Sequence, residues 1–265
     1  FYADILDYLE QILNRQGYEL LVCLFHDDPI RVKRYLRFLT EIRASGVIFG
    51  SFNAAKSQKD IDAAKQYMSM VSMQADIEDV DRVDVDDYAG TYLAIEHLIK
   101  NGHRKIGFLG YDYDLHILGE RARAYRQCLA DHGIPFRPEY FLDTHQTYDT
   151  GYEMTSHLLE LPDPPTALHS FNEYMVPNIY AAIYDHGLRI PDDISVTAFD
   201  GIRVSTLQRP RTTTVVGPIE AMAQTASSIL LNRIENPDAH AEVQHIVFKT
   251  KLIERGYVKN INPSD

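Results

Sequence analysis

Residues 188–200 read LRIPDDISVTAFD, and this stretch shows the pattern on which the fold is built. The run from Ile194 to Phe199 is short and apolar, which is typical of a strand inside a parallel sheet. It follows a turn-forming Pro-Asp-Asp and stops at one carboxylate, Asp200. A charge at the end of an apolar strand is either a turn residue or a ligand contact. Which of these roles Asp200 has is the main functional question that the sequence raises.

Outward from this stretch, strand-like and helix-like segments alternate along the chain. Strands are expected at 18–25, 46–52, 70–74, 105–110, 166–171 and 194–199, with one or two more in 244–258. Helices are expected at 4–16, 30–42, 56–68, 90–100, 121–132, 151–161, 173–186 and 219–234. The alternation predicts an α/β fold of doubly wound parallel sheets covered by helices on both faces. This number of strands and helices is too large for one small sheet and suits two lobes.

Composition and charge exclude several classes of protein. The 265 residues carry a formal net charge of −12, a poor match for nucleic-acid phosphates, which need clustered Lys and Arg. Every apolar run is far shorter than the roughly 18 residues of a membrane helix. The two cysteines, Cys23 and Cys128, are expected to be buried thiols in a reducing cytoplasm, with a disulfide as the alternative. These residues alone are therefore expected to bind neither DNA nor a membrane.

Signals for catalysis and for metal binding are weak. The sequence has no phosphate-binding loop, no nucleophile elbow and no zinc-protease motif. The eleven histidines are dispersed, and the spacing of His97 and His103 across a predicted helix end is poor for a metal. The sequence therefore predicts a protein that is not an enzyme and that has no metal or cofactor.

Polar residues follow three of the predicted strands. Arg121 begins the helix after 105–110, Asn172 follows 166–171, and Asp200 follows 194–199. Open α/β sheets bind ligands outside the carboxyl ends of their strands. Aromatic residues stand beside these polar groups: Tyr111, Phe171 and Phe199. A carboxylate, a guanidinium, an amide and aromatic rings together favour a neutral polyhydroxyl ligand.

Each of these residues also has a simpler interpretation. Asn172 can be the N-cap of the next helix, and Asp200 can be a turn residue. Arg121 can be a solvated residue, and Arg123 beside it is an equally good candidate. The functional interpretation rests on the three residues occurring together at strand ends.

Five stretches stand out in order along the chain: AGTYLAIEHLIKNGHRKIGFLG (89–110), RARAYRQCLADHGI (121–134), PPTALHSFNEYM (164–175), GLRIPDDISVTAFD (187–200) and RPRTTTVVGPIEAMAQTASSILLNRI (209–234). Together they resemble the effector-binding core of the LacI/GalR family of bacterial transcription regulators. The resemblance implies two lobes of periplasmic-binding-protein type I architecture, joined by crossover strands, with an effector between them. It places residues 1–86 plus 217–238 in the N-terminal lobe and residues 87–216 plus 239–265 in the C-terminal lobe. The family's helix-turn-helix DNA-binding headpiece is not among these residues.

The resemblance also implies a set of effector contacts. Arg121 stands four residues before Tyr125, as the family's effector-binding arginine does before its aromatic. The family's asparagine and aspartate fall on Asn172 and Asp200. The other positions implied or suggested as contacts are Phe1, Tyr2, Gln146 and Tyr148, together with Tyr111 and Phe171 from the strand ends.

The sequence thus predicts the sensing and dimerising core of a cytoplasmic transcription regulator, a repressor that binds a sugar-like metabolite. It is expected to form a homodimer and to meet operator DNA only through the headpiece. An exported sugar-binding protein of a transport system is the alternative. The GHRKI, IPDDISV and TTT stretches favour the regulator.

Overall fold

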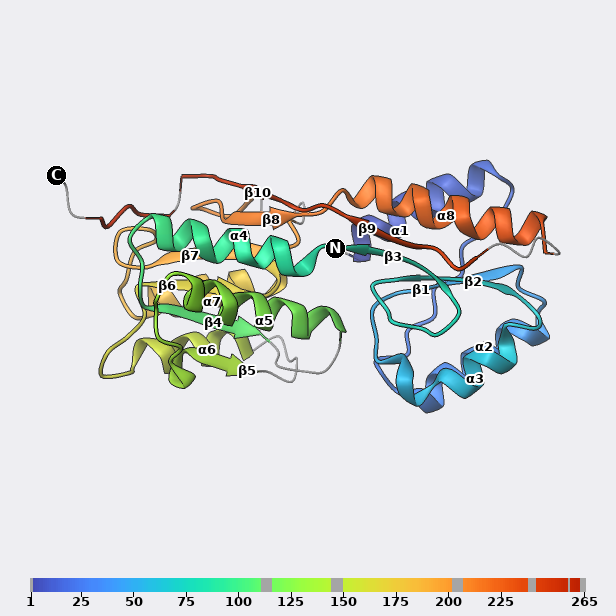
Figure 1. Cartoon of the computed structure of the whole chain (residues 1–265), viewed down its shortest axis with the longest axis horizontal. Coiled ribbons are helices and arrows are strands. Elements are labelled where there is room, and N and C mark those ends of the chain that lie inside the picture. The colour runs from blue at the N-terminus through green and yellow to red at the C-terminus, as the bar shows by residue number, and fades with distance from the viewer. Residues whose placement is uncertain are drawn as a thin grey trace. The chain divides into compact units, whose positions relative to one another are not determined.

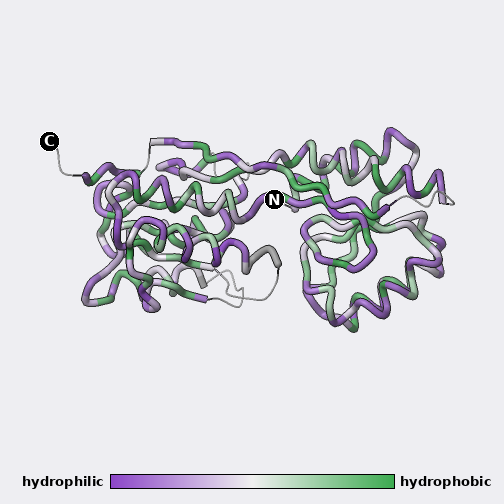
Figure 2. Tube along the Cα trace, viewed as in Figure 1, coloured by the Kyte–Doolittle hydropathy of each residue, from purple (hydrophilic) through white to green (hydrophobic). Residues whose placement is uncertain are grey.

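The computed structural model of the chain describes residues 2–110, 116–143, 150–201, 207–237, 242–256 and 258–262. The chain divides into two compact units (Figure 1). Unit 1 consists of Phe1–Val85 and Pro218–Phe248, and unit 2 of Asp86–Gly217 and Lys249–Asp265. Hydrophobic and hydrophilic segments alternate along the trace of both units (Figure 2), as layered α/β folds require.

Unit 1 is built on a parallel sheet with the strand order β1-β2-β3-β9. Its strands are β1 (Gly46–Phe49), β2 (Ser69–Met73), β3 (Asp81–Val85) and β9 (His245–Phe248). The helices are α1 (Tyr2–Arg15), α2 (Pro29–Glu41), the short η1 (Ala54–Lys56), α3 (Gln58–Ala64) and α8 (Ile219–Glu235). α1 packs against α8 on one face of this sheet, and α2 packs against α3 on the other (Figure 1).

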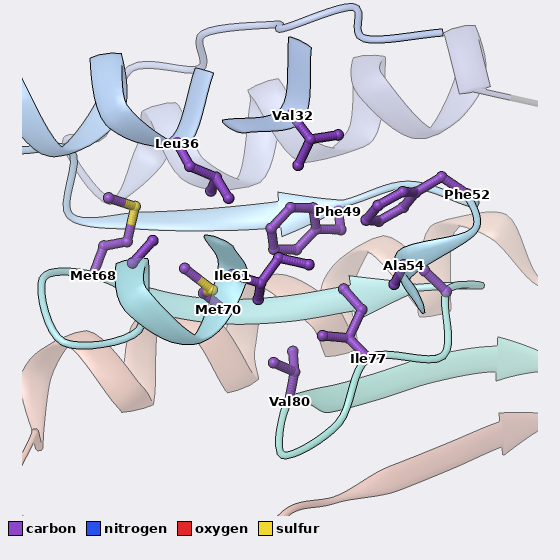
Figure 3. Packing of buried hydrophobic residues seen from close by; sticks show 12 residues of the cluster. Val32, Leu36, Phe49, Phe52, Ala54, Ile61, Met68, Met70, Ile77 and Val80 are labelled. Atoms are coloured by element: carbon purple, nitrogen blue, oxygen red, sulfur yellow. The ribbon is translucent and has the colours of Figure 1, made fainter. Parts of the chain in front are cut away.

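The core of unit 1 fills the space between its sheet and the pair α2 and α3. Val32 and Leu36 of α2 point toward Phe49 of β1, and Ile61 of α3 lies over Met70 of β2 (Figure 3). α2 begins where the Asp28 carboxylate accepts a hydrogen bond from the Ile30 amide at 2.9 Å, with Pro29 in the first turn. The cap and the apolar stripe together explain why this segment is a helix and which face it buries.

Unit 2 is built on a sheet with the strand order β10-β8-β7-β6-β4-β5. Its strands are β4 (Ile106–Gly110), β5 (Phe141–Asp143), β6 (Ala167–Ser170), β7 (Ser195–Phe199), β8 (Thr213–Val216) and β10 (Lys251–Ile253), of which only β10 is antiparallel to its neighbour. The helices are α4 (Asp87–Lys100), α5 (His116–Asp131), η2 (Pro138–Tyr140), α6 (Thr150–Leu159), η3 (Glu173–Met175) and α7 (Val176–Asp185).

The helices of unit 2 pack in pairs, α4 with α5 and α6 with α7. Successive residues of β4 face opposite clusters, Phe108 that of α4 and α5 and Leu109 that of α6 and α7.

The predicted fold class is confirmed: the chain is α/β, with two mainly parallel sheets covered by helices. None of the helices among the described residues is long and apolar enough to cross a bilayer. Both cysteines are free thiols, and only Cys128 is fully buried; Cys23 is partly exposed.

The strand predicted at 18–25 is wrong. Residues 18–25 have no strand conformation, although they are apolar enough for one. A strand exists only where a neighbouring strand takes up its backbone N–H and C=O groups. In the sheet of unit 1, β1 is the edge strand, and no strand among the described residues pairs with residues 18–25.

The C-terminal tail does not belong to unit 2 as one block, contrary to the boundary expected at residue 239. β9 pairs with β3 in the sheet of unit 1, and the chain passes to unit 2 only after Phe248. The Asp81 carboxylate explains the attachment. It accepts two hydrogen bonds from Arg233, at 2.7 and 2.8 Å, and one from the Gln244 amide at 2.8 Å. A buried charge at the start of β3 is thereby paired only when α8 and the tail are both in place.

Two histidines of unit 2 are buried in neutral form. His103 accepts from the Thr166 hydroxyl through Nδ1 (2.9 Å) and donates to the Lys259 carbonyl through Nε2 (3.1 Å), since a carbonyl can only accept. His169 of β6 is fully buried, with Nδ1 3.0 Å from the Thr197 hydroxyl. Burial lowers the pKa of His103 to about 4 and that of His169, helped by the nearby Arg121 charge, to about 3.

These two pKa values predict acid sensitivity. A histidine whose pKa is lower in the folded chain binds its proton preferentially in the unfolded chain. Stability is therefore full above the ordinary histidine pKa and falls as the pH drops below about 6.5. We expect urea titrations between pH 7 and pH 5 to show a loss of up to about 1.4 kcal/mol per pH unit for each histidine. The slope should become shallower in His169→Phe, and an unchanged slope would contradict the assignment.

Candidate functional site

The turn after β7 holds Asp200 in an unusual backbone conformation. Its φ is 101°, and Gly201 follows with a φ of 61°. The Asp200 amide donates to the Val215 carbonyl of β8 at 2.9 Å. A Cβ built on Gly201 would lie 2.0 Å from Val216 Cγ1, so this position accepts only glycine. The turn therefore fixes where the Asp200 carboxylate stands at the carboxyl end of the sheet.

Contacts with other residues of unit 2 hold the side chain of Arg121, in α5, in place. Its Nε donates to Asp87 Oδ1 at 2.6 Å, and its Nη1 donates to the Phe171 carbonyl. Its Nη2 lies 3.5 Å from Asp200 Oδ1. The guanidinium carbon lies 3.6 Å from the centroid of the Phe199 ring, a cation–π contact. Arg121 thus joins the ends of β6 and β7 to the start of α4.

The charges at this site are largely buried. The Arg121 side chain is 5% exposed, that of Asp87 is 5% exposed, and that of Asp200 is 12% exposed. Burial raises the pKa of Asp200, and the neighbouring Arg121 opposes that effect. Burial alone would lower the pKa of Arg121, but Asp87 and Asp200 hold it above its usual value. Two carboxylates thus surround one guanidinium, so the group has an excess of negative charge when both are ionised.

Asn172 has the capping role that was one of its two expected roles. Its Oδ1 accepts from the Met175 amide at 3.2 Å at the start of η3. Its side-chain nitrogen makes no hydrogen bond within the described residues, so it is open to a second partner. The Phe171 ring is only 4% exposed and packs into the core with Phe108 and Tyr125. Phe171 therefore contributes its backbone carbonyl to the site, and its ring supports the fold.

The structure thus brings together Arg121, Asp200 and the backbone of Phe171, with Asn172 next in the chain. Tyr2 lies in unit 1, where its hydroxyl oxygen accepts from the Ser51 amide at 2.6 Å beyond the end of β1. The other predicted effector contacts lie outside the described residues: Phe1, Tyr111, Gln146 and Tyr148.

Sequence reasoning missed Asp87. The acidic pair Asp86-Asp87 opens α4, and its two members have different roles. Asp86 Oδ1 accepts from the Ala89 amide at 2.8 Å and caps the helix, while Asp87 turns inward to Arg121. Gly90 allows α4 to lie this close, because a Cβ there would be 2.7 Å from Phe199 Cε2. An acidic pair at a helix start, of which only one can be the cap, is the signal that could have found it.

No group of three or more possible metal ligands occurs in the part of the chain that the structure describes. The arrangement suits hydrogen bonding. Asp200 offers carboxylate oxygens as acceptors, Arg121 holds that carboxylate in place, and the Asn172 amide can donate. These are the groups that recognise hydroxyls on a small ligand.

Comparison with known proteins gives a consistent result. A family model described as "Periplasmic binding protein-like domain" matches residues 95–256. The transcriptional repressor PurR of Mannheimia succiniciproducens is 30% identical over 263 residues, covering 98% of this chain and 78% of the repressor. PurR of Aliivibrio fischeri is 31% identical over 264 residues, with the same two coverages.

Solved structures agree with these relatives. A LacI family transcriptional regulator from Enterococcus faecium, solved with bound ribose, superimposes with a TM-score of 0.87 at 25% identity, covering 98% of this chain and 95% of that one. These relatives are transcription regulators rather than enzymes. The chain therefore belongs to the LacI family of transcription regulators, of which it forms the periplasmic-binding-protein-like, effector-binding core.

Proposed function

We propose that this chain senses a neutral, sugar-like metabolite at the carboxyl ends of β6 and β7, and that the effector controls DNA binding by a helix-turn-helix headpiece of the same repressor. The observation that carries the proposal is the fixed Asp200 carboxylate. It stands at a strand end, is held by Arg121 at 3.5 Å, and keeps a small exposed fraction through which hydroxyls can reach it.

The balance of charge supports a neutral ligand. Arg121 is already paired with Asp87, so it has little attraction left for a phosphate or carboxylate on the effector. Asp200 would repel such a group, whereas it accepts hydrogen bonds from hydroxyls. The Enterococcus faecium regulator, with its bound ribose, is a precedent within the same fold.

A thermal-shift screen of the 265-residue chain tests the proposal. We propose pentoses, hexoses and disaccharides as one set, the corresponding sugar phosphates as a second set, and nucleosides as a third. Stabilisation by a neutral sugar, followed by calorimetric titration, is the expected result. A ligand found only among the phosphates would contradict the proposed chemistry. The fold alone suits an exported sugar-binding protein equally well. The regulator is favoured because both PurR relatives described above are repressors.

We further propose that the regulator is a cytoplasmic homodimer that binds a two-fold operator through paired headpieces. The helices near 4–16 and 175–186 are the candidate contact surfaces. Tyr174 and Tyr184, at either end of the second, are both nearly half exposed, as aromatic side chains at an interface would be in an isolated chain. Sedimentation velocity at tens of micromolar should give the mass of a dimer. Substituting Tyr184 by Asp should shift that mass toward the monomer, and a monomeric parent chain would count against the proposal.

A further inference from the structure

The two carboxylates beside Arg121 are not equivalent. Asp87 is the closer partner, with its Oδ1 2.6 Å from Arg121 Nε, whereas Asp200 Oδ1 lies 3.5 Å from Arg121 Nη2. The Asp87 side chain is also the more buried, at 5% exposure against 12% for Asp200. The charge of Arg121 is therefore compensated mainly by Asp87, and the Asp200 carboxylate keeps oxygen lone pairs that can accept from a ligand.

The start of α4 holds Asp87 in this position. Asp86 is the N-cap of the helix, so Asp87 has no capping role and stands in the first turn, where the helix dipole favours a negative charge. Gly90, nearly one turn further, packs directly against the sheet. A Cβ on Gly90 would lie 2.7 Å from Phe199 Cε2 and 2.8 Å from Val215 Cγ1. Close packing of α4 thus fixes the Asp87 carboxylate beside Arg121.

Each nitrogen of the Arg121 guanidinium already has an acceptor or an anion beside it. Nε donates to Asp87, Nη1 donates to the Phe171 carbonyl, and Nη2 faces Asp200. The Phe199 ring covers one planar face of the group. An arginine typically binds a phosphate or a carboxylate through two parallel N–H groups along one edge of its fork. An incoming anion would have to displace one of these partners before it could form such a pair.

The net charge of the three groups decides which ligands they attract. Two ionised carboxylates and one guanidinium leave an excess of one negative charge, and like charges that meet at a desolvated site strongly disfavour binding. Without the charge of Asp87, the group would be neutral, and Arg121 would have only Asp200 as an anionic partner. Removing that one charge should therefore make the site more tolerant of anions.

We propose that Asp87 is a positioning residue that makes this site select neutral ligands over anionic ones. It compensates and orients Arg121 from the α4 side without contacting the ligand. Arg121 is thereby withheld from phosphates and carboxylates, and Asp200 is left to accept hydrogen bonds from hydroxyls. This inference names the residue that sets the ligand class, and it rests on the ligand site at Asp200 proposed above.

A purely structural role for Asp87 predicts a different result. If the carboxylate served only to hold α4 to α5, its loss would weaken the binding of every ligand. If its charge sets the selectivity, its loss should strengthen the binding of an anion. The direction of the change in anion affinity therefore distinguishes the two roles.

Sulfate titrations of four proteins test the proposal: the parent chain, Asp87→Asn, Asp87→Glu and Asp192→Asn. Sodium sulfate is the probe, at constant ionic strength, and calorimetry gives the affinity. Asparagine keeps an oxygen that accepts from Arg121 Nε but removes the charge, so sulfate affinity should rise at least about tenfold. Glutamate keeps the charge and should leave sulfate binding as weak as in the parent chain. Asp192→Asn removes an exposed carboxylate beside Arg189 and should have no effect.

The Nε–H resonance of Arg121 shows where the sulfate binds. It should shift on addition of sulfate in Asp87→Asn and stay unchanged in the parent chain. Equal sulfate affinities in Asp87→Asn and Asp192→Asn, or equal gains in Asp87→Asn and Asp87→Glu, would overturn the proposal. If Asp87→Asn is unfolded, Asp87→Ser takes its place, because the serine hydroxyl also provides a neutral acceptor, and the same outcomes decide.

The neutral sugars of the thermal-shift screen separate this proposal from the proposed function. A gain in sulfate affinity in Asp87→Asn, with no neutral sugar bound by the parent chain, would support the exclusion of anions by Asp87 and contradict only the proposed function. A parent chain that binds a neutral sugar, with no gain in sulfate affinity in Asp87→Asn, would contradict only the role of Asp87.

Discussion

Replacing Arg121 by methionine should lower the free energy of unfolding by about 3–5 kcal/mol, because removing one partner of a buried ion pair leaves an uncompensated charge. Here two carboxylates, Asp87 and Asp200, would lose their common partner, and the Phe171 carbonyl would lose a donor. Equilibrium urea unfolding at pH 7 measures the change. The sequence alone suggested a ligand contact for Arg121, whereas the structure pairs its side chain with Asp87, Asp200 and the Phe171 carbonyl of unit 2.

Arg123 is the matched control, since the sequence could not distinguish it from Arg121. It lies two residues further along α5, is largely exposed, pairs with Glu120 and lies over the Tyr88 ring. Arg123→Met should change stability by no more than about 1 kcal/mol, the usual range for a surface ion pair. A double variant, Asp87→Asn with Arg121→Met, should recover part of the loss. Equal effects of the two arginine substitutions would mean that the Asp87–Arg121–Asp200 group does not stabilise unit 2.

Replacing Asp200 by asparagine should weaken effector binding by about 2–4 kcal/mol, because it truncates a charged hydrogen-bonding partner at a nearly buried position. Asparagine also tolerates a positive φ, so the turn should keep its conformation. Stability should fall less than in Arg121→Met, since Arg121 retains Asp87. Calorimetric titration with the effector from the screen gives the affinity.

This substitution separates the two roles that the sequence left open for Asp200. A turn residue would tolerate asparagine with no change in affinity, whereas a hydroxyl acceptor would not. Asp192→Asn is the control, because Asp192 is exposed in the turn before β7 and pairs with Arg189. Wild-type affinity in Asp200→Asn would return Asp200 to the turn interpretation.

Much of the fold followed from local pattern. The apolar runs at 105–110, 166–171 and 194–199 became β4, β6 and β7. Asn172 and Asp200 follow β6 and β7 as expected, whereas Arg121 lies inside α5, which begins at His116, and not at the start of that helix. This worked because a fully buried parallel strand must be apolar over its whole length. The sequence did not reveal β3, whose residues DRVDV are all buried. Its charges are paired with residues far away in the chain, such as Arg233 and His245, and no local pattern reports those partners.

The sequence by itself determined the alternation of strands and helices, the two-sheet class, the family resemblance and the position of Arg121 and Asp200 at one end of unit 2. Only the tertiary structure decided what those residues contact. The inward turn of Asp87, the capping role of Asn172 and the assignment of β9 to unit 1 depend on which elements become neighbours. The case of 18–25 has the same cause. Its composition suits a strand, but a strand forms only beside another strand that accepts and donates its backbone hydrogen bonds. Whether such a neighbour is present depends on the tertiary structure.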